Sequence, residues 1–371
     1  MSLALDHLGL TIGAVPTISD VSLTLERGTM NVLLGPTLAG KTTLMRLMAG
    51  LDRPTSGRLL LDGKDITGVP VRRRSVAMVY QQFVNYPTLS VYENIASPLR
   101  VAKVAQAEID ARVQSAAKLL RLEKMLDRTP AQLSGGQQQR TAIARALVKR
   151  ADLVLLDEPL ANLDYKLREE LREELPRIFA ESGAILVYAT TEPTEALLLG
   201  GNTATLWQGR VSQVGPTASV YRRPHNIDAA RVFSDPPLNE LTVDKRGTVI
   251  TLADGRQMPA VGPLQGLPDG GYRVGFRVDD VTVGAPPPAA TLGGGTPGTF
   301  SFPGQVSVTE ISGSESFVHV DVGLATWVCL VRGVHEWEPG AAAEVHVDPS
   351  RIFAFGATGR IAGLPTMAEA V

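Results

Sequence analysis

Short apolar runs alternate with helical patterns over residues 1–235. Met30 to Leu34, Leu153 to Leu156 and Ile185 to Val187 are continuous apolar runs of strand length. Such runs are typical of strands that are buried on both faces of a parallel sheet. Glu108 to Leu122 and Gln137 to Lys149 carry the period of helices instead. The alternation predicts an α/β domain in which helices cover a sheet.

Three local signals complete the prediction for this part. Leu59 to Leu61 runs into Asp62-Gly63, a strong two-residue turn signal, so we predict a β-hairpin arm there. Thr42 to Ala49 is predicted to be a helix that follows a glycine loop. A helix-rich block, about residues 82–150, is predicted to be inserted before the Leu153 strand.

Strand patterns dominate after Pro236-Pro237. Short apolar stretches recur at Thr248 to Leu252, Tyr272 to Phe276, Gln305 to Val308, Ser316 to Val320, Thr326 to Val331 and Ala343 to Val347. Regularly spaced short strands predict a small β-barrel or sandwich. Ala285 to Thr299 is rich in Pro, Gly and Ala and is predicted to be a linker or exposed loop. We therefore predict two domains, 1–235 and 236–371.

Composition narrows the class of protein. The 371 residues carry a net charge of −2, which creates no strong field toward nucleic acid or anionic lipid. No apolar run approaches the roughly 18 to 20 residues that cross a bilayer, and the N-terminus lacks the basic segment of a signal peptide. The single cysteine, Cys329, cannot form an internal disulfide, which fits a reducing cytosol. We interpret it as a small buried apolar residue rather than a reactive thiol.

A glycine loop lies between the Met30 strand and the Thr42 helix and fits the phosphate-binding pattern G-x-x-x-x-G-K-[ST]. Glycines let backbone N–H groups turn toward phosphates, and the helix directs its positive N-terminus at them. We expect Lys41 to bridge the β- and γ-phosphates of ATP and Thr42 to ligate Mg²⁺. The alternative is an ordinary glycine turn. The candidate nucleotide-binding residues in this loop are Gly35, Pro36, Thr37, Leu38, Ala39, Gly40, Lys41, Thr42 and Thr43.

The Leu153 to Leu156 strand runs directly into an acidic pair, Asp157-Glu158. Asp157 is expected to hold Mg²⁺, directly or through water, and Glu158 to polarise the attacking water. The alternative is a strand-end pair that only caps a loop. The phosphate loop upstream favours the catalytic interpretation.

Leu133-Ser134-Gly135-Gly136-Gln137 opens a predicted helix and allows two interpretations. Ser134 and Gln137 form a good capping box, which needs no further function. Gly135 and Gly136 are not needed by a cap, and they expose bare backbone N–H groups at a positive helix end. That combination is an anion site.

Taken together, these elements resemble the ATP-binding cassette (ABC) family. The resemblance rests on the phosphate loop, Tyr80-Gln81-Gln82, Leu133 to Arg140, Leu155 to Pro159 and Ala161-Asn162-Leu163-Asp164, in this order and spacing. It implies that two cassettes face each other, with each ATP held between one phosphate loop and the other chain's Ser134–Gln137 segment. It also implies that Gln81 senses Mg²⁺ and the γ-phosphate. Asp164 would link the two sites, or be a plain helix N-cap.

Other segments resemble the carbohydrate importers of that family. These are Met78 to Leu99, Gly209 to Gly215 and Val220 to Pro224. Gly275 to Val281, Glu310 to Glu315 and Phe353 to Gly359 match their appended OB-type regulatory domain. The implied fold is a P-loop cassette with an antiparallel β arm and a helical subdomain, followed by an OB-type β domain. The implied partners are membrane permease subunits, which Gln82 to Leu99 would face, a second ATPase and, indirectly, a solute-binding protein, with no nucleic acid.

The sequence departs from the family at the site for its own ATP. Thr191 stands where a histidine usually contacts the γ-phosphate, and Ile12 stands near the usual adenine-stacking aromatic. Leu38 and Ala39 replace small polar residues or glycine in the phosphate loop. Ser134–Gln137, the half donated to a partner, is intact. We therefore expect an asymmetric pair with a non-identical ATPase, although a homodimer in which Thr191 suffices and a mainly regulatory subunit remain alternatives.

Three segments resemble most closely the ATPases of bacterial glycerol importers that are built with two non-identical ATPases. These segments are Gly35 to Thr43, Tyr188 to Pro193 and Leu197 to Thr205. The resemblance implies an ATPase at the cytoplasmic face of the membrane that uses ATP and Mg²⁺ to drive import. An ATPase of this kind makes no contact with the transported solute. One charged run stays ambiguous: Arg72, Arg73 and Arg74 are either a solvated turn or a contact to phosphate or a partner.

Overall fold

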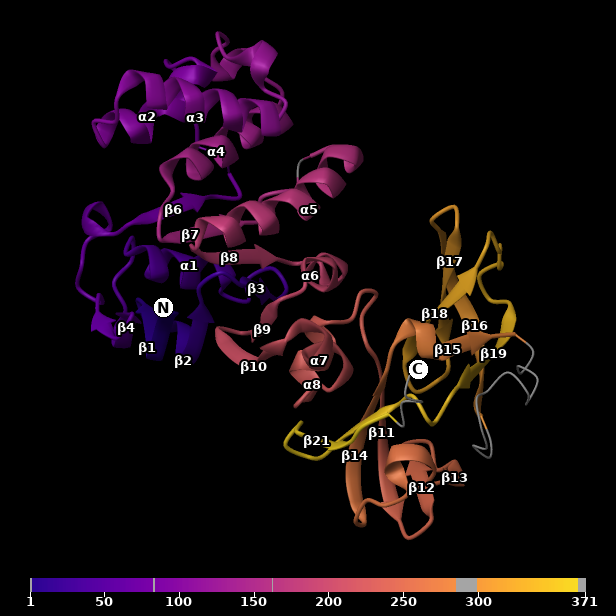
Figure 1. Cartoon of the computed structure of the whole chain (residues 1–371). Helices are drawn as coiled ribbons and strands as arrows, with labels where there is room; N and C mark the ends of the chain where they lie inside the picture. Colours follow the sequence, from indigo (N-terminus) through magenta and orange to yellow (C-terminus); the bar gives the residue numbers. More distant parts are fainter. Residues whose placement is uncertain (1, 83, 162, 285–298, 366–371) are drawn as a thin grey trace. The chain divides into compact units, whose positions relative to one another are not determined.

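The computed structural model describes residues 2–82, 84–161, 163–284 and 299–365, without the side chains of 179–182. They fall into two compact units, Met1–Val220 and Tyr221–Val371 (Figure 1). Asn162 and nearly all of the predicted linker, 285–298, lie outside the described residues. Among the described helices, none combines the length and the apolar character that a membrane span requires.

A six-stranded sheet forms the centre of the first unit, in the order β10-β9-β3-β8-β7-β6. Its strands are β3 (Met30–Leu34), β6 (Val76–Val79), β7 (Leu153–Asp157), β8 (Ile185–Thr190), β9 (Asn202–Trp207) and β10 (Arg210–Pro216). All of them run parallel to their neighbours except β10, which is antiparallel to β9. Every residue of β3, β7 and β8 is buried, which explains why these strands are apolar throughout rather than alternating.

A second, antiparallel sheet forms the predicted arm. Its order is β2-β1-β4-β5, with β1 (Ser2–Ile12), β2 (Val15–Glu26), β4 (Ser56–Leu61) and β5 (Lys64–Asp65). Leu61 pairs with Lys64 across the turn, and Asp62 and Gly63 have φ of 51° and 79°. Two consecutive positive φ values are those of a type I′ turn, so the predicted Asp-Gly hairpin is confirmed.

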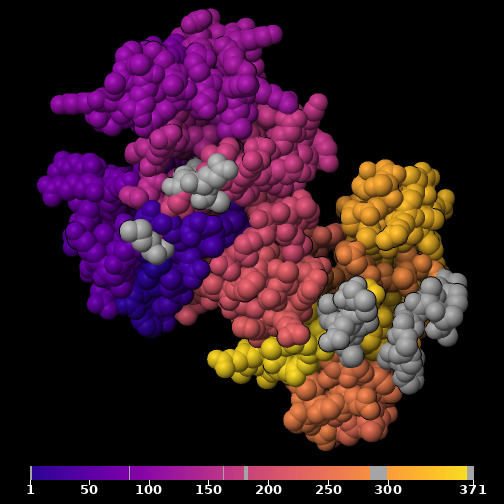
Figure 2. All heavy atoms as spheres, in the orientation of Figure 1, coloured from indigo at the N-terminus to yellow at the C-terminus, as the bar shows by residue number. Residues whose placement is uncertain are grey.

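The described residues also form eight α-helices. They are α1 (Lys41–Ala49), α2 (Val91–Val101), α3 (Gln106–Leu119), α4 (Gly135–Lys149), α5 (Tyr165–Ser182), α6 (Pro193–Leu199), α7 (Thr217–Arg222) and α8 (Ile227–Val232). Helices α2, α3 and α4 pack against one another and form a lobe of the first unit, visible in purple in Figure 2. This lobe is the predicted helix-rich block between β6 and β7.

Arg74 has a role that the sequence interpretation missed. Its guanidinium donates to the carbonyl oxygens of Met48 at 2.8 Å and Ile66 at 2.7 Å, and its Nε donates to Val69 O at 2.8 Å. It therefore binds orphan carbonyls at the end of α1, where a cation also complements the helix dipole. Arg74 is thus neither a solvated turn residue nor a phosphate contact, whereas Arg72 and Arg73 are exposed.

The second unit is all-β after α8, and it confirms the predicted OB-type β domain as a barrel-like pair of antiparallel sheets. One sheet has the order β13-β12-β11-β14-β20-β21 and the other β15-β19-β16-β17-β18. The strands are β11 (Asn239–Arg246), β12 (Val249–Leu252), β13 (Gln257–Pro259), β14 (Gly270–Phe276), β15 (Val281–Val283), β16 (Phe300–Ile311), β17 (Glu315–Asp321), β18 (Thr326–Arg332), β19 (Ala342–Val347), β20 (Phe353–Phe355) and β21 (Ile361–Gly363).

Trp327 anchors the core of the second unit. Its ring lies edge to face with Phe276 and Phe302, at centroid distances of 5.0 and 4.8 Å. Such pairs add stabilisation beyond the apolar area that they bury. Cys329, two residues along β18, is also fully buried, and burial raises the pKa of its thiol to about 12. The interpretation of Cys329 as a buried apolar residue is therefore confirmed.

Candidate nucleotide site

The phosphate loop, residues 35–40, connects β3 to α1 at the carboxyl edge of the central sheet (Figure 1). A Cβ atom on Gly35 would lie 2.5 Å from Leu206 O, so the loop can pass β9 only without a side chain there. Gly40 is the residue before α1 and has φ of 102°, which favours glycine. Both glycines of the pattern are therefore required by geometry. They leave the N-terminus of α1 open to an anion.

The backbone of this loop holds the side chain of Lys41 in place. Its Nζ donates to Gly35 O at 2.7 Å and to Pro36 O at 3.1 Å, and it lies 3.8 Å from Glu158 Oε1. Burial lowers the pKa of Lys41, while the charges of Glu158 and Asp157 raise it. A cation held beside the bare amides of the loop is suited to binding phosphate oxygens.

Thr42 and Asp157 meet at the same edge. The Thr42 hydroxyl donates to Asp157 Oδ2 at 2.7 Å, although the two residues are far apart in the sequence. Burial raises the pKa of Asp157, and the Thr42 hydrogen bond and Lys41 oppose that effect. The two side chains offer hard oxygen ligands of the kind that Mg²⁺ takes in small number, with phosphates and water completing the shell. They therefore fit a Mg²⁺ ion. No cluster of three or more metal-binding side chains occurs in the part of the chain that the structure describes.

Glu158 adopts an unusual backbone conformation directly after β7. Its φ is 46°, in the left-handed region that few non-glycine residues enter. Its backbone N–H donates to Ala189 O at 3.0 Å, and Gln81 Nε2 donates to its Oε2 at 2.9 Å. Burial raises the pKa of Glu158 and the charge of Lys41 opposes that effect, so the carboxylate accepts a proton more readily than an ordinary glutamate does. Strain of this kind is often found at functional sites.

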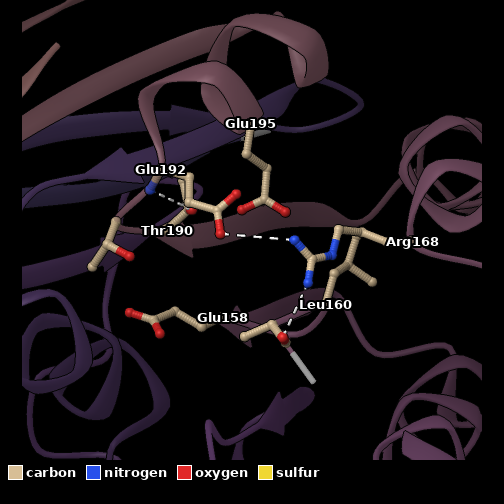
Figure 3. Close-up of a pocket in the computed structure, with 8 residues that line it drawn as sticks. Glu158, Leu160, Arg168, Thr190, Glu192 and Glu195 are labelled. Atoms are coloured by element: carbon tan, nitrogen blue, oxygen red, sulfur yellow. Dashed lines mark hydrogen bonds and ion pairs between the residues drawn. The ribbon is translucent and has the colours of Figure 1, made fainter. Parts of the chain in front are cut away.

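A small pocket opens beside Glu158 (Figure 3). Its lining comes from Glu158 and the loop after it, from α5, from the end of β8 and from the start of α6. The residues are Glu158, Leu160, Ala161, Arg168, Thr190, Thr191, Glu192 and Glu195. Thr190 Oγ1 accepts a hydrogen bond from the Glu192 N–H at 3.0 Å. Thr191 therefore lies in the wall that Glu158 also lines, at the position where the family resemblance implies a histidine.

Three charged pocket residues, Arg168, Glu192 and Glu195, were not singled out by the sequence. The Glu192 carboxylate faces Arg168 at 3.9 Å, and Arg168 also donates to Ala161 O at 3.1 Å (Figure 3). The Tyr188 hydroxyl donates to Glu195 Oε1 at 2.6 Å inside the core, where burial raises the pKa of Tyr188. Glu192 and Glu195 had one signal in the sequence, their position next to Thr191, whereas Arg168 had none.

The Ser134–Gln137 segment begins α4 and is built as a complete capping box. Ser134 Oγ accepts from the Gln137 N–H at 3.4 Å, and the Ser134 N–H donates to Gln137 Oε1 at 3.0 Å. Ser134 and Gly135 are exposed. Among the residues that the structure describes, no hydrogen bond joins this segment to the phosphate loop of the same chain. The capping interpretation is confirmed, and the glycines remain open to an external anion.

The remaining candidates are Asp164 and two apolar residues, Ile12 and Leu38. Asp164 Oδ1 accepts from the Leu167 N–H at 3.0 Å, which is N-cap geometry for α5. Ile12 lies at the tip of the β1–β2 turn and is 60% exposed. Leu38 is 96% exposed and has φ of 68°, a left-handed conformation that glycine enters most readily. The loop therefore bears its leucine at the cost of strain.

Comparisons with known proteins agree with this geometry. A family model described as ABC transporter matches residues 18–161. The trehalose/maltose import ATP-binding protein MalK of Thermococcus litoralis is 35% identical over 359 residues, which cover 93% of this chain and 95% of that protein. The sn-glycerol-3-phosphate import ATP-binding protein UgpC of Bordetella avium is 36% identical and is matched over 82% of its length and 83% of this chain.

Solved structures resemble a large part of the chain. A dimeric ATP-binding cassette in a post-hydrolysis state, bound to ADP and Pi, superimposes with a TM-score of 0.53 at 29% identity. The match covers 58% of this chain and 98% of the cassette. The shared part therefore comprises a whole cassette, and the remainder of this chain lies outside it.

Proposed function

This chain belongs to the ATP-binding subunits of ABC importers, and on that premise we propose that it drives carbohydrate or polyol import from an asymmetric ATPase pair. As a member of this family it is an ATPase coupled to transport through a membrane permease. The observation that carries the proposal is Thr191 in the wall of the Glu158 pocket. Its own ATP site thus has the acidic pair without the usual histidine.

The residues of its own site divide the work as follows. Lys41 and the amides of residues 35–40 bind the phosphates, and Thr42 and Asp157 hold Mg²⁺, whose charge stabilises the phosphate oxygens. The Glu158 carboxylate orients the attacking water and accepts its proton. Gln81, which donates to that carboxylate at 2.9 Å, reports the state of the site to the permease. Thr43 follows in the first turn of α1, where its backbone N–H adds to the positive end of the helix.

Thr191 weakens this site without abolishing it. A threonine hydroxyl is shorter than an imidazole and cannot donate a charge-assisted hydrogen bond to the γ-phosphate. The missing bond costs roughly 1.5 to 3 kcal/mol if it forms mainly in the transition state. That corresponds to a turnover on the order of 10- to 100-fold slower. The exposed Ile12 offers adenine apolar contact but no ring stacking.

The donated half serves the other ATP. The free N–H groups of Gly135 and Gly136 at the positive end of α4 are suited to the γ-phosphate held by a second cassette. The exposure of Ser134 and the intact capping box support this role. Asp164 would reach the partner from the start of α5, where its side chain also caps that helix. A partner with a complete site would then perform most of the hydrolysis.

We assign residues 1–235 to the cassette and 236–371 to a regulatory domain. Gln82 to Leu99 would face the permease, and a solute-binding protein would deliver the solute on the other side. The chain would be peripheral, at the cytoplasmic face of the membrane. Relatives named for sugar and glycerol-phosphate import support the solute class. We propose glycerol itself because the sequences of Gly35 to Thr43 and Tyr188 to Pro193 resemble those of glycerol importers.

The experiment that tests the asymmetric pair is a subunit count. The tagged chain is extracted gently from its own membranes and the intact complex is weighed by native mass spectrometry. We expect one copy of this chain, one different ATPase and permease subunits. Two copies of this chain would make both sites identical and refute the asymmetry. Recovery without any membrane protein, while a control transporter stays intact, would refute the transporter assignment.

The solute is tested separately. Reconstituted complex is assayed for ATP-dependent uptake of glycerol, glycerol 3-phosphate, maltose and a polyamine, with the cognate binding protein. We expect uptake of glycerol alone. Uptake of one of the other solutes would refute glycerol while leaving the asymmetric pair in place.

A further inference from the structure

Gln139 is a buried amide that the function described so far does not use. It lies in the second turn of α4 and is 1% exposed. Its Nε2 donates to Pro159 O at 2.6 Å and lies 3.5 Å from Glu158 O. Because carbonyl oxygens only accept, the NH₂ end of the amide must face them.

The oxygen end of the Gln139 amide does not explain why a glutamine stands here. Within the part of the chain that the structure describes, Gln139 Oε1 is buried without a hydrogen-bond partner. An unpaired buried acceptor is unfavourable, and an apolar side chain of the same length would avoid the penalty. The bond to the 158–159 backbone is therefore the feature that the amide supplies.

That backbone is the one that needs support. Glu158 has φ of 46°, a conformation that persists only where its surroundings hold it. Its N–H is fixed by β8 through Ala189, and its carboxylate is met by Gln81. The carbonyl side of the turn is fixed from α4, by Gln139.

We propose that Gln139 is a positioning residue, whose amide holds the Glu158–Pro159 turn so that the Glu158 carboxylate stays aimed at the attacking water. The same side chain joins α4 to the acidic pair. Because α4 starts at the Ser134–Gln137 segment, a displacement of that segment by a partner's ATP is transmitted to Glu158 through one hydrogen bond. This inference rests on the proposed roles of Glu158 and of the donated segment.

The competing explanation is that Gln139 only fills space beneath residues 158–160. Gln139→Met distinguishes the two, because it keeps the length of the side chain and removes the donor. Gln138→Met is the matched control. Gln138 is the next residue on the same helix, and its Nε2 donates to Pro130 O at 3.1 Å and Leu133 O at 3.4 Å, away from the acidic pair.

The assay is single-turnover ATP hydrolysis by the purified full chain, normalised to the folded fraction from thermal melting. Nucleotide affinity is measured separately with a fluorescent ATP analogue. We expect Gln139→Met to lower the rate at saturating ATP by roughly ten- to a hundred-fold, the loss expected from a misplaced catalytic group, with KM and the analogue Kd unchanged. Gln138→Met should stay within about two-fold of the wild-type rate.

A rate loss in Gln139→Met no larger than that in Gln138→Met would overturn the proposal, as would a loss that matches the unfolded fraction. Gln139→Asn guards against a variant that does not fold. It keeps the amide but is one methylene shorter and cannot span to Pro159. We expect the same rate loss, and a wild-type rate in this variant would also overturn the proposal.

Glu158→Gln completes the set. A strong rate loss in this variant with a wild-type rate in Gln139→Met would overturn the inference alone. A wild-type rate in Glu158→Gln would overturn the proposed role of Glu158, and with it the inference.

Discussion

The half-site proposed for this chain's own ATP and the half proposed for a partner's ATP differ in how fully they keep the family pattern. The own half carries Thr191, an exposed Ile12 and a leucine in a left-handed conformation at Leu38. The donated half, Ser134–Gln137, is complete and makes both hydrogen bonds of its capping box. The two halves lie on separate elements. The own half is at the ends of β3, β7 and β8, and the donated half is at the start of α4. One proposed half can therefore depart from the family pattern while the other keeps it.

The largest expected effect comes from a charge in the donated half. Aspartate caps helices as well as serine does, so Ser134→Asp keeps α4 but places a negative charge beside the partner's γ-phosphate. We expect steady-state ATP turnover of the assembled transporter to fall at least about 100-fold. Ser134→Asn, a neutral cap of the same shape, is the control and should lose far less. Equal losses in the two variants would contradict a phosphate contact.

Glu158→Gln in the same assembly tests the half-site proposed for this chain's own ATP. If the partner's site performs most hydrolysis, this variant should lower steady-state turnover by less than about ten-fold, even though it removes the general base of the own site. A loss as large as that of Ser134→Asp would mean that both sites hydrolyse. That outcome favours the homodimer.

The next effect is a gain. Thr191→His should raise single-turnover hydrolysis at the own site roughly 10- to 100-fold, because the imidazole restores a charge-assisted hydrogen bond to the γ-phosphate. Thr191→Ser keeps the hydroxyl and should leave the rate unchanged. An unchanged rate in the histidine variant would show that this position does not limit the own site.

The pH dependence of the own site should reflect the buried acidic pair. Burial raises the pKa of Glu158 above the ordinary glutamate value of about 4.3. The carboxylate is the active form, so single-turnover hydrolysis should be complete above the raised pKa and be lost as the pH falls through it. A rate profile with its acid limb at or below the ordinary value would contradict Glu158 as the base.

The smallest effect concerns the strained loop position. Leu38→Gly removes a left-handed leucine that costs roughly 1–2 kcal/mol, partly offset by the greater freedom of glycine in the unfolded chain. We expect the melting temperature to rise by roughly 2–4 °C for each kcal/mol gained. Leu198→Gly, at an exposed position in α6, should lower it instead. A lower melting temperature in Leu38→Gly would show that the loop stabilises its leucine.

Much of the fold followed from local sequence. The strands β3, β7 and β8 and the Asp62-Gly63 turn were predicted because apolar runs and turn residues act over a few neighbours. In the β unit the strand predictions were also confirmed, because each run has its own period and turn. Strand order and register were not predicted, since they depend on pairs that are distant in the chain.

The candidate site was predicted unevenly for the same reason. The phosphate loop and acidic pair were found because their residues are contiguous. Arg74 was misinterpreted, because its partners are carbonyl oxygens at the end of α1 and in the 66–69 loop. Arg168 and Gln139 were missed because their contacts lie on other elements.

The sequence by itself determined the family and the two kinds of fold, and it supplied the proposed residues for phosphate, Mg²⁺ and water chemistry. These are properties of local patterns, which a few adjacent residues fix through backbone and side-chain preferences. Only the tertiary structure decided that Thr42 meets Asp157, that Gln81 meets the carboxylate of Glu158, and that Gln139 supports its strained turn. Those contacts arise from the packing of β3, β7 and α4, because hydrogen bonds between distant segments leave no periodic trace in the sequence.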